Sequence, residues 1–392
     1  MKSFRLVALM SFALGVALMW SAGAVSAAVH TVNPGDSIQD AIDAAAPGDT
    51  VKVMPGDYTG VPAGSSAAAI RITKKLKLIA KSKIKKDVRV RILPGVGQTH
   101  GILIEPATPG DPDVEGVLVK GFTVEGFQNN GIWLRHVNKF KIIGNESINN
   151  LENGIWPTLS ANGTVKKNVS YGSQDSALWV EASENVRVIK NDLHHSPTGL
   201  EVTVSQNIKI QKNIIHNNTV GIGLYHPSAA GLPPLMPLER NGDWTVTDNH
   251  VYDNNEPNTA PGGMSAELPP GGGILVLGVD RVTVSKNLVE NNGFFGVGVI
   301  DWCGAVAGTA FDCSTNPPDV QSAPDDNLIV ENELNGNGLV PQGDPFFQLL
   351  AKDLSFLSPV LPSAPVGGMN NCFKDNLPLT LTTGFLTPNQ CM

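Results

Sequence analysis

Apolar and polar residues alternate in a block that recurs every 22 or 23 residues along the middle of the chain. The blocks begin at residues 131, 154, 177, 199 and 221; their second and fourth positions are apolar, and their third and fifth positions vary. Such alternation predicts a short strand with one buried and one exposed face. The period suits one coil of three short strands. The sequence therefore predicts an all-β fold, a single-stranded right-handed parallel β-helix.

A column of asparagines marks the same register. Each of them follows an apolar residue by three positions, at Asn145, Asn168, Asn191, Asn213, Asn249, Asn287 and Asn332. Asparagine tolerates left-handed turn conformations, and its amide can bond to identical turns above and below it. We therefore expect a structural ladder of turns rather than a catalytic column.

The chain divides into three parts. Residues 1–28 resemble a signal peptide, because two basic residues precede an apolar stretch that ends in small residues; an N-terminal membrane anchor is the alternative. Residues 29–340 form the expected β-helix, and residues 341–392, where the register is lost, form a C-terminal cap or tail. We expect a secreted or periplasmic protein with no stable membrane insertion after signal cleavage, since no other stretch is long and apolar enough to span a bilayer.

The opening of the mature chain predicts a cap over the first coil. Asp36 or Ser37 can cap a short amphipathic helix that Pro47 and Gly48 stop. The stretch PGDSIQDAIDAAAPGDTVKVMPGDY resembles the opening of secreted and periplasmic β-helix proteins of the pectin-lyase-like superfamily. That superfamily includes polysaccharide lyases, uronan C5-epimerases and periplasmic maturation factors of the nitrous oxide reductase copper site. The resemblance implies this fold over roughly residues 29–340.

The resemblance leaves the activity open. In the superfamily's enzymes the catalytic residues lie on the outward face of the sheet that lines the substrate groove. The D-P-H-D sequence of the epimerases is absent here, and so are the clustered aspartates, G-H-G and R-I-K of the hydrolases. The resemblance therefore does not point to a galacturonan hydrolase.

The charged residues are unevenly distributed along the chain. Gly and Pro are abundant, at 41 and 28, which suits many turns, and the net charge is −8. Residues 71–91 nevertheless contain ten Lys or Arg and a single Asp. This band either holds an anionic polymer or surface, or is a solvated first coil. No aromatic residues interleave it, so we expect no nucleic-acid partner.

Three insertions lengthen the repeat, around residues 227–240, 256–271 and 303–324. Two leave the chain just after the strand that carries the tryptophans, and one arrives just before it. Insertions in solenoids usually map to the binding face. We therefore expect them to overhang a groove from opposite sides.

Trp133, Trp156 and Trp179 fall in one outward column of that expected groove. Successive strands lie roughly 4.8 Å apart, so the three side chains would form an aromatic strip. Aromatic faces suit the C–H faces of sugars, which predicts a polysaccharide as the partner. The alternative is that the insertions or another subunit cover the tryptophans.

Glu181 and Glu201 are outward residues on neighbouring strands. Their carboxyl groups would approach to about 5–9 Å, the range of acid–base carboxylate pairs. A lyase or epimerase acting on a uronate must neutralise the sugar carboxylate, remove the C5 proton and protonate the far side or the leaving oxygen. Arg135, Tyr225 and His226 are suited to these tasks, as is a bound Ca²⁺, although no cofactor motif is evident. The alternative is ordinary solvated polar positions.

A second outward column contains His194 and His216 on adjacent coils, flanked by Tyr171, Tyr252 and Glu290. Two imidazoles within reach can bind copper or zinc. A stacked aromatic ladder is the favoured interpretation, because third and fourth ligands are not evident. Asp301, at a strand end, is a further candidate for a cation site.

Four cysteines in an exported chain predict disulfides. Of three pairings, the local one joins Cys303 to Cys313 and Cys372 to Cys391. The sequence thus predicts a protein that binds an acidic polysaccharide, with lyase or C5-epimerase chemistry. The alternatives are a non-catalytic surface or carbohydrate-binding protein and a periplasmic metal-site maturation factor.

Overall fold

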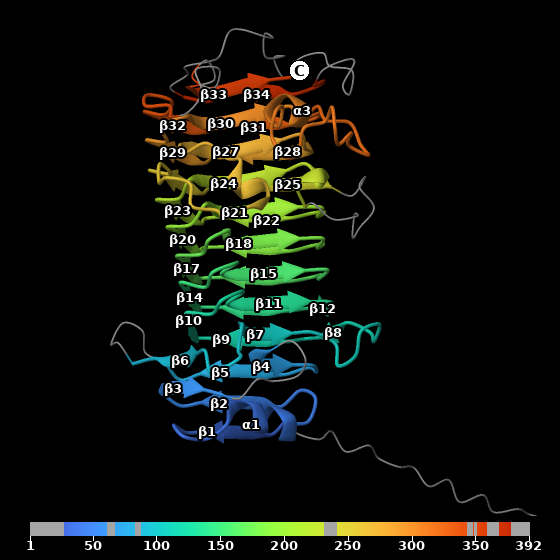
Figure 1. The fold of residues 1–392 in the computed structure, drawn as a ribbon, viewed down its shortest axis with the longest axis vertical. Coiled ribbons are helices and arrows are strands. Elements are labelled where there is room, and N and C mark those ends of the chain that lie inside the picture. Colours follow the sequence, from blue (N-terminus) through green and yellow to red (C-terminus); the bar gives the residue numbers. More distant parts are fainter. Residues whose placement is uncertain are drawn as a thin grey trace, which may run out of the picture.

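The chain winds into a right-handed parallel β-helix in which three sheets run the length of the molecule (Figure 1). This computed structural model describes residues 27–60, 67–82, 88–230, 241–342, 348, 351–358 and 368–377. From β2 to β33 the described coils contribute strands to the three sheets in the order A, B, C, and neighbouring strands are parallel. The predicted fold class is confirmed.

Sheet A consists of β1 (Val29–Val32), β2 (Thr50–Val53), β5 (Lys77–Ala80), β9 (Leu118–Lys120), β13 (Lys141–Ile143), β16 (Thr164–Lys166), β19 (Arg187–Ile189), β22 (Lys209–Gln211), β25 (Gly242–Thr247), β28 (Asp280–Ser285), β31 (Leu328–Val330) and β34 (Cys372–Lys374). Sheet B consists of β3 (Gly56–Thr59), β6 (Val90–Leu93), β10 (Thr123–Glu125), β14 (Glu146–Ile148), β17 (Val169–Tyr171), β20 (Asp192–His194), β23 (Ile214–His216), β26 (His250–Tyr252), β29 (Leu288–Glu290) and β32 (Glu333–Asn335).

Sheet C consists of β4 (Ala68–Ile72), β7 (His100–Ile104), β11 (Ile132–Arg135), β15 (Ile155–Thr158), β18 (Ser176–Glu181), β21 (Thr198–Thr203), β24 (Val220–Tyr225), β27 (Gly272–Leu277), β30 (Phe295–Ile300) and β33 (Lys352–Leu357). A small side pairing joins β8 (Val114–Glu115) to β12 (Val137–Asn138). The helices are α1 (Ile38–Ala44), α2 (Gly263–Ala266), α3 (Trp302–Ala305) and the 3₁₀ turn η2 (Pro227–Ala230).

The core is a stack of aliphatic side chains inside the coil. The second position of the repeat supplies one column, in which Ile132, Ile155, Leu178, Leu200 and Ile222 are all fully buried. Because the sheet pairing keeps these positions in register, each side chain packs on its equivalents in the coils above and below. The alternation in the sequence is therefore the direct cause of the fold.

The asparagine ladder forms as the sequence predicts. The side-chain amide of Asn168 donates to the Asn191 side-chain oxygen at 2.9 Å, and that of Asn191 donates to Asn213 at 3.0 Å. Each amide also donates to a backbone carbonyl, so these buried groups are satisfied. The left-handed conformation belongs to the preceding residue, with φ of 56° at Lys167 and 57° at Lys190. The asparagine itself acts through its hydrogen bonds.

Helix α1 closes the first coil. Ser37 caps it, accepting a hydrogen bond from the Asp40 amide at 3.1 Å, and Ile38 and Ile42 are buried in the core. A solenoid needs such a cap, because its first coil has no preceding coil to cover it. The predicted helix is therefore confirmed, whereas most of the predicted signal segment, residues 1–26, lies outside the described residues.

The β-helix continues beyond the expected boundary at residue 340. Strand β33 pairs with β30, and β34 pairs with β31, so residues 352–357 and 372–374 add to sheets C and A. This coil could not be recognised from the sequence, because its strands lack the glycine that opens most of the other repeats. None of the described helices is long and apolar enough to cross a membrane.

The insertions cover one end of sheet C, as their positions predict. They bring η2, α2 and α3 over β24, β27 and β30, where Met264 and Leu268 join a second apolar cluster with Leu275 and Ile300. The predicted disulfide between Cys303 and Cys313 is present within the third insertion. The second predicted pairing involves Cys391, which lies outside the described residues.

Candidate functional site

The three tryptophans form a continuous stack on the outer face of sheet C. The rings of Trp133 and Trp156 lie 5.0 Å apart with an interplanar angle of 5°, and those of Trp156 and Trp179 lie 5.0 Å apart at 4°. All three residues are partly exposed. The strand register therefore brings together the residues that the sequence placed in one column.

The orientation of the rings differs from the expectation. Parallel rings at this spacing turn their faces toward each other, so the stack offers ring edges to a ligand. The outer face of Trp133 lies beside the His100 ring and under the Arg135 guanidinium, each 5.0 Å from its centroid. The indole nitrogens of Trp133 and Trp156 are buried and have no hydrogen-bond partner among the described residues, whereas the Trp179 N–H donates to the Thr203 hydroxyl at 2.8 Å.

Glu201 occupies the next position of the column after Trp179. It is only 4% exposed and accepts a hydrogen bond from the Ser176 hydroxyl at 2.7 Å. Burial, and the negative charges of Asp175 and Glu181 nearby, raise the pKa of Glu201 well above its usual range. Burial in this position therefore favours the protonated form of the carboxyl group.

Glu181 lies one coil earlier and is 3% exposed. Its carboxylate accepts a hydrogen bond from the Thr158 hydroxyl at 3.1 Å. Burial raises the pKa of Glu181 to about 7, although the Thr158 hydroxyl and the Trp156 indole oppose that shift. Glu181 thus changes its protonation state near neutral pH.

Asp175 and Tyr225 complete a group that we call the acidic cluster: Asp175, Glu181, Glu201 and Tyr225. Asp175 accepts a hydrogen bond from the Ser265 hydroxyl of α2 at 2.6 Å, and burial raises its pKa. Tyr225 is fully buried, and among the described residues its hydroxyl has no partner in hydrogen-bonding geometry. Burial and the adjacent Glu201 raise the pKa of Tyr225 well above its ordinary value, so it is a neutral donor.

Two carboxyl groups with different pKa values are the usual arrangement for paired acid and base catalysis. Here Glu181 can accept a proton near pH 7, while Glu201 and Tyr225 can donate one. The unpartnered Tyr225 hydroxyl is the strongest sign of a site, because a buried polar group without a partner costs about 1–3 kcal/mol. The arrangement is therefore suited to moving protons.

Arg135 stands apart from this cluster. It occupies the column of Glu181, but two strands away with Thr158 between them, so the two backbones are roughly 10 Å apart. Its guanidinium lies 3.7 Å from the Glu105 carboxylate, and its side chain is 41% exposed. Arg135 is thus placed to meet an anionic group at the far end of the tryptophan stack.

His226 and Asp301 are held by the insertions rather than by the cluster. The His226 ring stacks on Trp302 at 5.2 Å, and its two nitrogens lie 3.2 Å from the Gln321 carbonyl and the Ser228 amide. Burial lowers the pKa of His226 to about 4. Asp301 caps α3 through Gly304 and accepts a second hydrogen bond from Ser322. The polar atoms of His226 therefore contact the first and third insertions, and those of Asp301 contact the third.

Calcium does not fit the acidic cluster. Among the described residues, the one group of three His, Cys, Asp or Glu side chains with donor atoms within 4.8 Å of one another is Asp192, His194 and His216. The carboxylates of the acidic cluster do not converge in this way. They do not offer the roughly six to eight oxygen ligands that Ca²⁺ takes.

The sequence did not single out Asp175 or Ser265. Asp175 lies in the turn before β18, outside the alternating positions, and Ser265 belongs to an insertion 90 residues later. The only available sign was the position of that insertion just before a strand of sheet C. The hydrogen bond between these residues ties the insertion to the cluster.

Comparison with known proteins addresses the fold. Residues 101–232 match the family model of the right handed beta helix region. The mannuronan C-5 epimerase AlgE4 A-module of Azotobacter vinelandii superposes with a TM-score of 0.63 at 14% identity, over 86% of this chain and 82% of that one. The fold is a right-handed β-helix. The resemblance seen in the sequence is confirmed at that level.

Two further β-helix structures are similar. The AlgE6 A-module of the same organism gives a TM-score of 0.62 at 16% identity, over 86% of this chain and 81% of that one. The PL6 family alginate lyase AlyGC gives 0.50 at 12% identity, over 86% of this chain and 41% of that one. No curated protein matches the chain by sequence. At these identities the likeness concerns the β-helix alone.

Proposed function

We propose that the protein binds an acidic polysaccharide along the outer face of sheet C and processes it by lyase or C5-epimerase chemistry at the acidic cluster. The observation that supports this most directly is the pair Glu181 and Glu201, whose pKa values are raised to different extents beside the unpartnered Tyr225 hydroxyl. Structures similar in fold include two mannuronan epimerases and an alginate lyase, which favours a uronate polymer.

In the proposed reaction, ionised Glu181 removes the C5 proton of a uronate, and the electron pair passes toward the sugar carboxyl group. A lyase then forms the C4–C5 double bond as the C4–oxygen bond breaks, and Tyr225 or Glu201 protonates the leaving oxygen. An epimerase instead returns a proton to C5 from the opposite face. Because burial favours the neutral form of Glu201, the cluster repels an anionic sugar less than a set of solvated, ionised carboxylates would.

The tryptophan stack supplies the binding surface of this proposal. The partly exposed rings of Trp133, Trp156 and Trp179 supply apolar contact area for sugar rings. Arg135, at the far end of the stack, pairs with the carboxylate of a sugar unit removed from the reacting one. The polymer would therefore lie along the helix axis.

The test is incubation of the purified protein with alginate, pectate and glycosaminoglycans. Ultraviolet absorbance detects an unsaturated product, and NMR detects epimerised units. Glu181→Gln keeps the shape of the side chain and should abolish turnover, while Glu331→Gln, at an exposed turn far from the cluster, should leave it unchanged. If no polymer is changed by the wild-type protein, the catalytic half of the proposal is wrong.

Non-catalytic binding is a second candidate, and the burial of both glutamates favours it. Each glutamate accepts a hydroxyl hydrogen bond and is at most 4% exposed. In this case polysaccharide retention on an affinity gel would be equal for wild-type protein and Glu181→Gln, with no product from either. For either candidate, we infer that the protein works outside the cytoplasm, which the Cys303–Cys313 disulfide and the signal-like residues 1–28 support.

A further inference from the structure

A second ladder of rings lies on the outer face of sheet B. The register pairs Tyr171 with His194, His194 with His216, and His216 with Tyr252. Consecutive ring centroids are 4.7, 4.9 and 4.9 Å apart, and each pair is stacked. The stacked ladder favoured by the sequence is therefore present, with two imidazoles at its centre.

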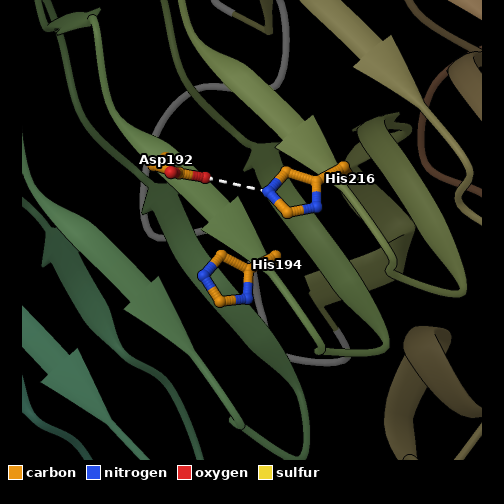
Figure 2. Close-up of side chains that lie close together, drawn as sticks. All are labelled: Asp192, His194 and His216. Carbon is orange, nitrogen blue, oxygen red and sulfur yellow. Dashed lines mark hydrogen bonds and ion pairs between the residues drawn. The ribbon is translucent and has the colours of Figure 1, made fainter.

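Asp192 adds a carboxylate that the sequence pattern did not reveal. It lies two residues before His194 on β20, so both side chains leave the same face of sheet B. Its Oδ1 is 3.1 Å from Nε2 of His216 on the neighbouring strand β23. One donor atom from each of Asp192, His194 and His216 lies within 4.8 Å of the others (Figure 2).

In each of these two strands, the residue directly after the histidine lies in the turn and contacts the histidine ring. Asn217 Oδ1 lies 2.7 Å from Nδ1 of His216, and the two Nδ1 atoms of His194 and His195 lie 2.6 Å apart. Both turn residues are left-handed, with φ of 51° at Asn217 and 52° at His195, which folds them back beside the rings. With Nδ1 engaged, Nε2 is the ligand atom proposed for each ring, and in His216 this atom already contacts Asp192 Oδ1 at 3.1 Å, a contact that a bound ion would replace.

We propose that Asp192, His194 and His216 form an open binding site for a divalent transition metal of the zinc type. Two imidazoles and one carboxylate are ligands that zinc, copper and nickel accept, whereas calcium and magnesium take oxygen ligands. All three residues are partly exposed, so the coordination is completed by water or an external ligand. The donor atoms lie within 4.8 Å of one another and must approach further to share one ion, which small shifts of these partly exposed side chains allow.

This site is separate from the acidic cluster. It lies on sheet B, whereas Glu181 and Glu201 lie on sheet C, and no residue is shared between them. The metal proposal therefore does not depend on the proposed activity. An ion at this position would join β20 to β23 and stabilise the folded state, because the coil brings the ligands together only when folded.

The test is equilibrium dialysis of chelator-treated protein against zinc, with metal counted by mass spectrometry and Co²⁺ absorption reporting on the ligand geometry. We expect one equivalent per chain, and affinity at least about tenfold weaker in His216→Ala and in the isosteric Asp192→Asn. His250→Ala is the matched control. This residue pairs with Glu290 at 2.8 Å on the same sheet and is not part of the group of three.

Three results would overturn the site. The first is the absence of stoichiometric zinc in wild-type protein. The second is unchanged affinity in both His216→Ala and Asp192→Asn while their circular dichroism stays that of the wild type. The third is an equal loss of binding in His250→Ala, which would place the metal elsewhere. Loss in the two ligand variants alone, with normal melting curves, supports the proposal.

Discussion

Tyr225 folds its ring back over Gly223, two residues earlier on the same strand, and occupies the space beside Glu201 that a side chain at 223 would fill. A Cβ on Gly223 would overlap the Tyr225 hydroxyl and ring atoms. The column that holds Trp179 and Glu201 in the preceding coils is thus interrupted by a glycine that makes room for a phenol. This pairing buries a hydroxyl without a partner at the centre of the acidic cluster.

Tyr225→Phe should stabilise the protein and inactivate it. The variant removes a buried unpartnered hydroxyl, and we expect the free energy of unfolding to rise by about 1 kcal/mol. Turnover of the polysaccharide should fall by roughly a hundredfold or more, because a positioned proton donor is lost. Urea unfolding and the product assay check the two effects together. Tyr252→Phe on sheet B is the control and should change neither; wild-type turnover in Tyr225→Phe would remove Tyr225 from the mechanism.

The stability of the protein should depend on the protonation of Glu181. Its pKa is raised from 4.5 to about 7 on folding, so the folded state binds this proton more tightly than the unfolded state. The stabilisation is complete below about pH 4.5 and is lost as pH rises through 7, by about 3 kcal/mol in total. Gln has no proton to lose. The difference in unfolding free energy, wild type minus Glu181→Gln, should therefore fall between these pH values, and a flat difference would contradict the raised pKa.

Replacing Trp156 by Ala tests whether the tryptophan stack binds the polysaccharide. Ala removes the central ring, which stacks on Trp133 and on Trp179 at 5.0 Å and is partly exposed. If sugars bind the stack, Trp156→Ala should weaken polysaccharide retention by roughly thirtyfold, the effect of losing about 2 kcal/mol at a central aromatic contact. Trp156→Phe keeps a smaller stacked ring and is the comparison, which should retain more of the binding. Unchanged retention by Trp156→Ala, measured by affinity electrophoresis, would argue against the stack as the binding surface.

The asparagine ladder should contribute strongly to stability. Asn191→Ala removes amide hydrogen bonds to Val165 and Asn213 and leaves the buried Asn168 amide without its acceptor. We expect a loss of about 3 kcal/mol in the free energy of unfolding. Asn335→Ala, whose side chain bonds only to surface glutamates, should change it by less than about 0.5 kcal/mol. Similar losses in the two variants would show that the ladder has no special role.

The residue columns that repeat in successive coils could be predicted from the sequence, whereas contacts that occur only once in the structure could not. Columns such as Trp133, Trp156 and Trp179 follow from the period, because equivalent residues of successive coils must be neighbours. The direction of the ring planes does not follow, since it depends on side-chain torsions. Nor does the contact between Asp175 and Ser265, which joins a turn to an insertion 90 residues away. Burial of Glu181 and Glu201, and hence their raised pKa values, depends on such single contacts.

The ladder also explains how the chain tolerates its insertions. Asn168 and Asn191 are 23 residues apart and Asn213 and Asn249 are 36 apart, yet both pairs share the same 2.9 Å hydrogen bond. An insertion can therefore leave a coil at one turn and rejoin it without displacing the next coil. The insertions above sheet C can therefore vary while the β-helix core stays the same. New binding specificities can arise in them without loss of the contacts that stabilise the fold.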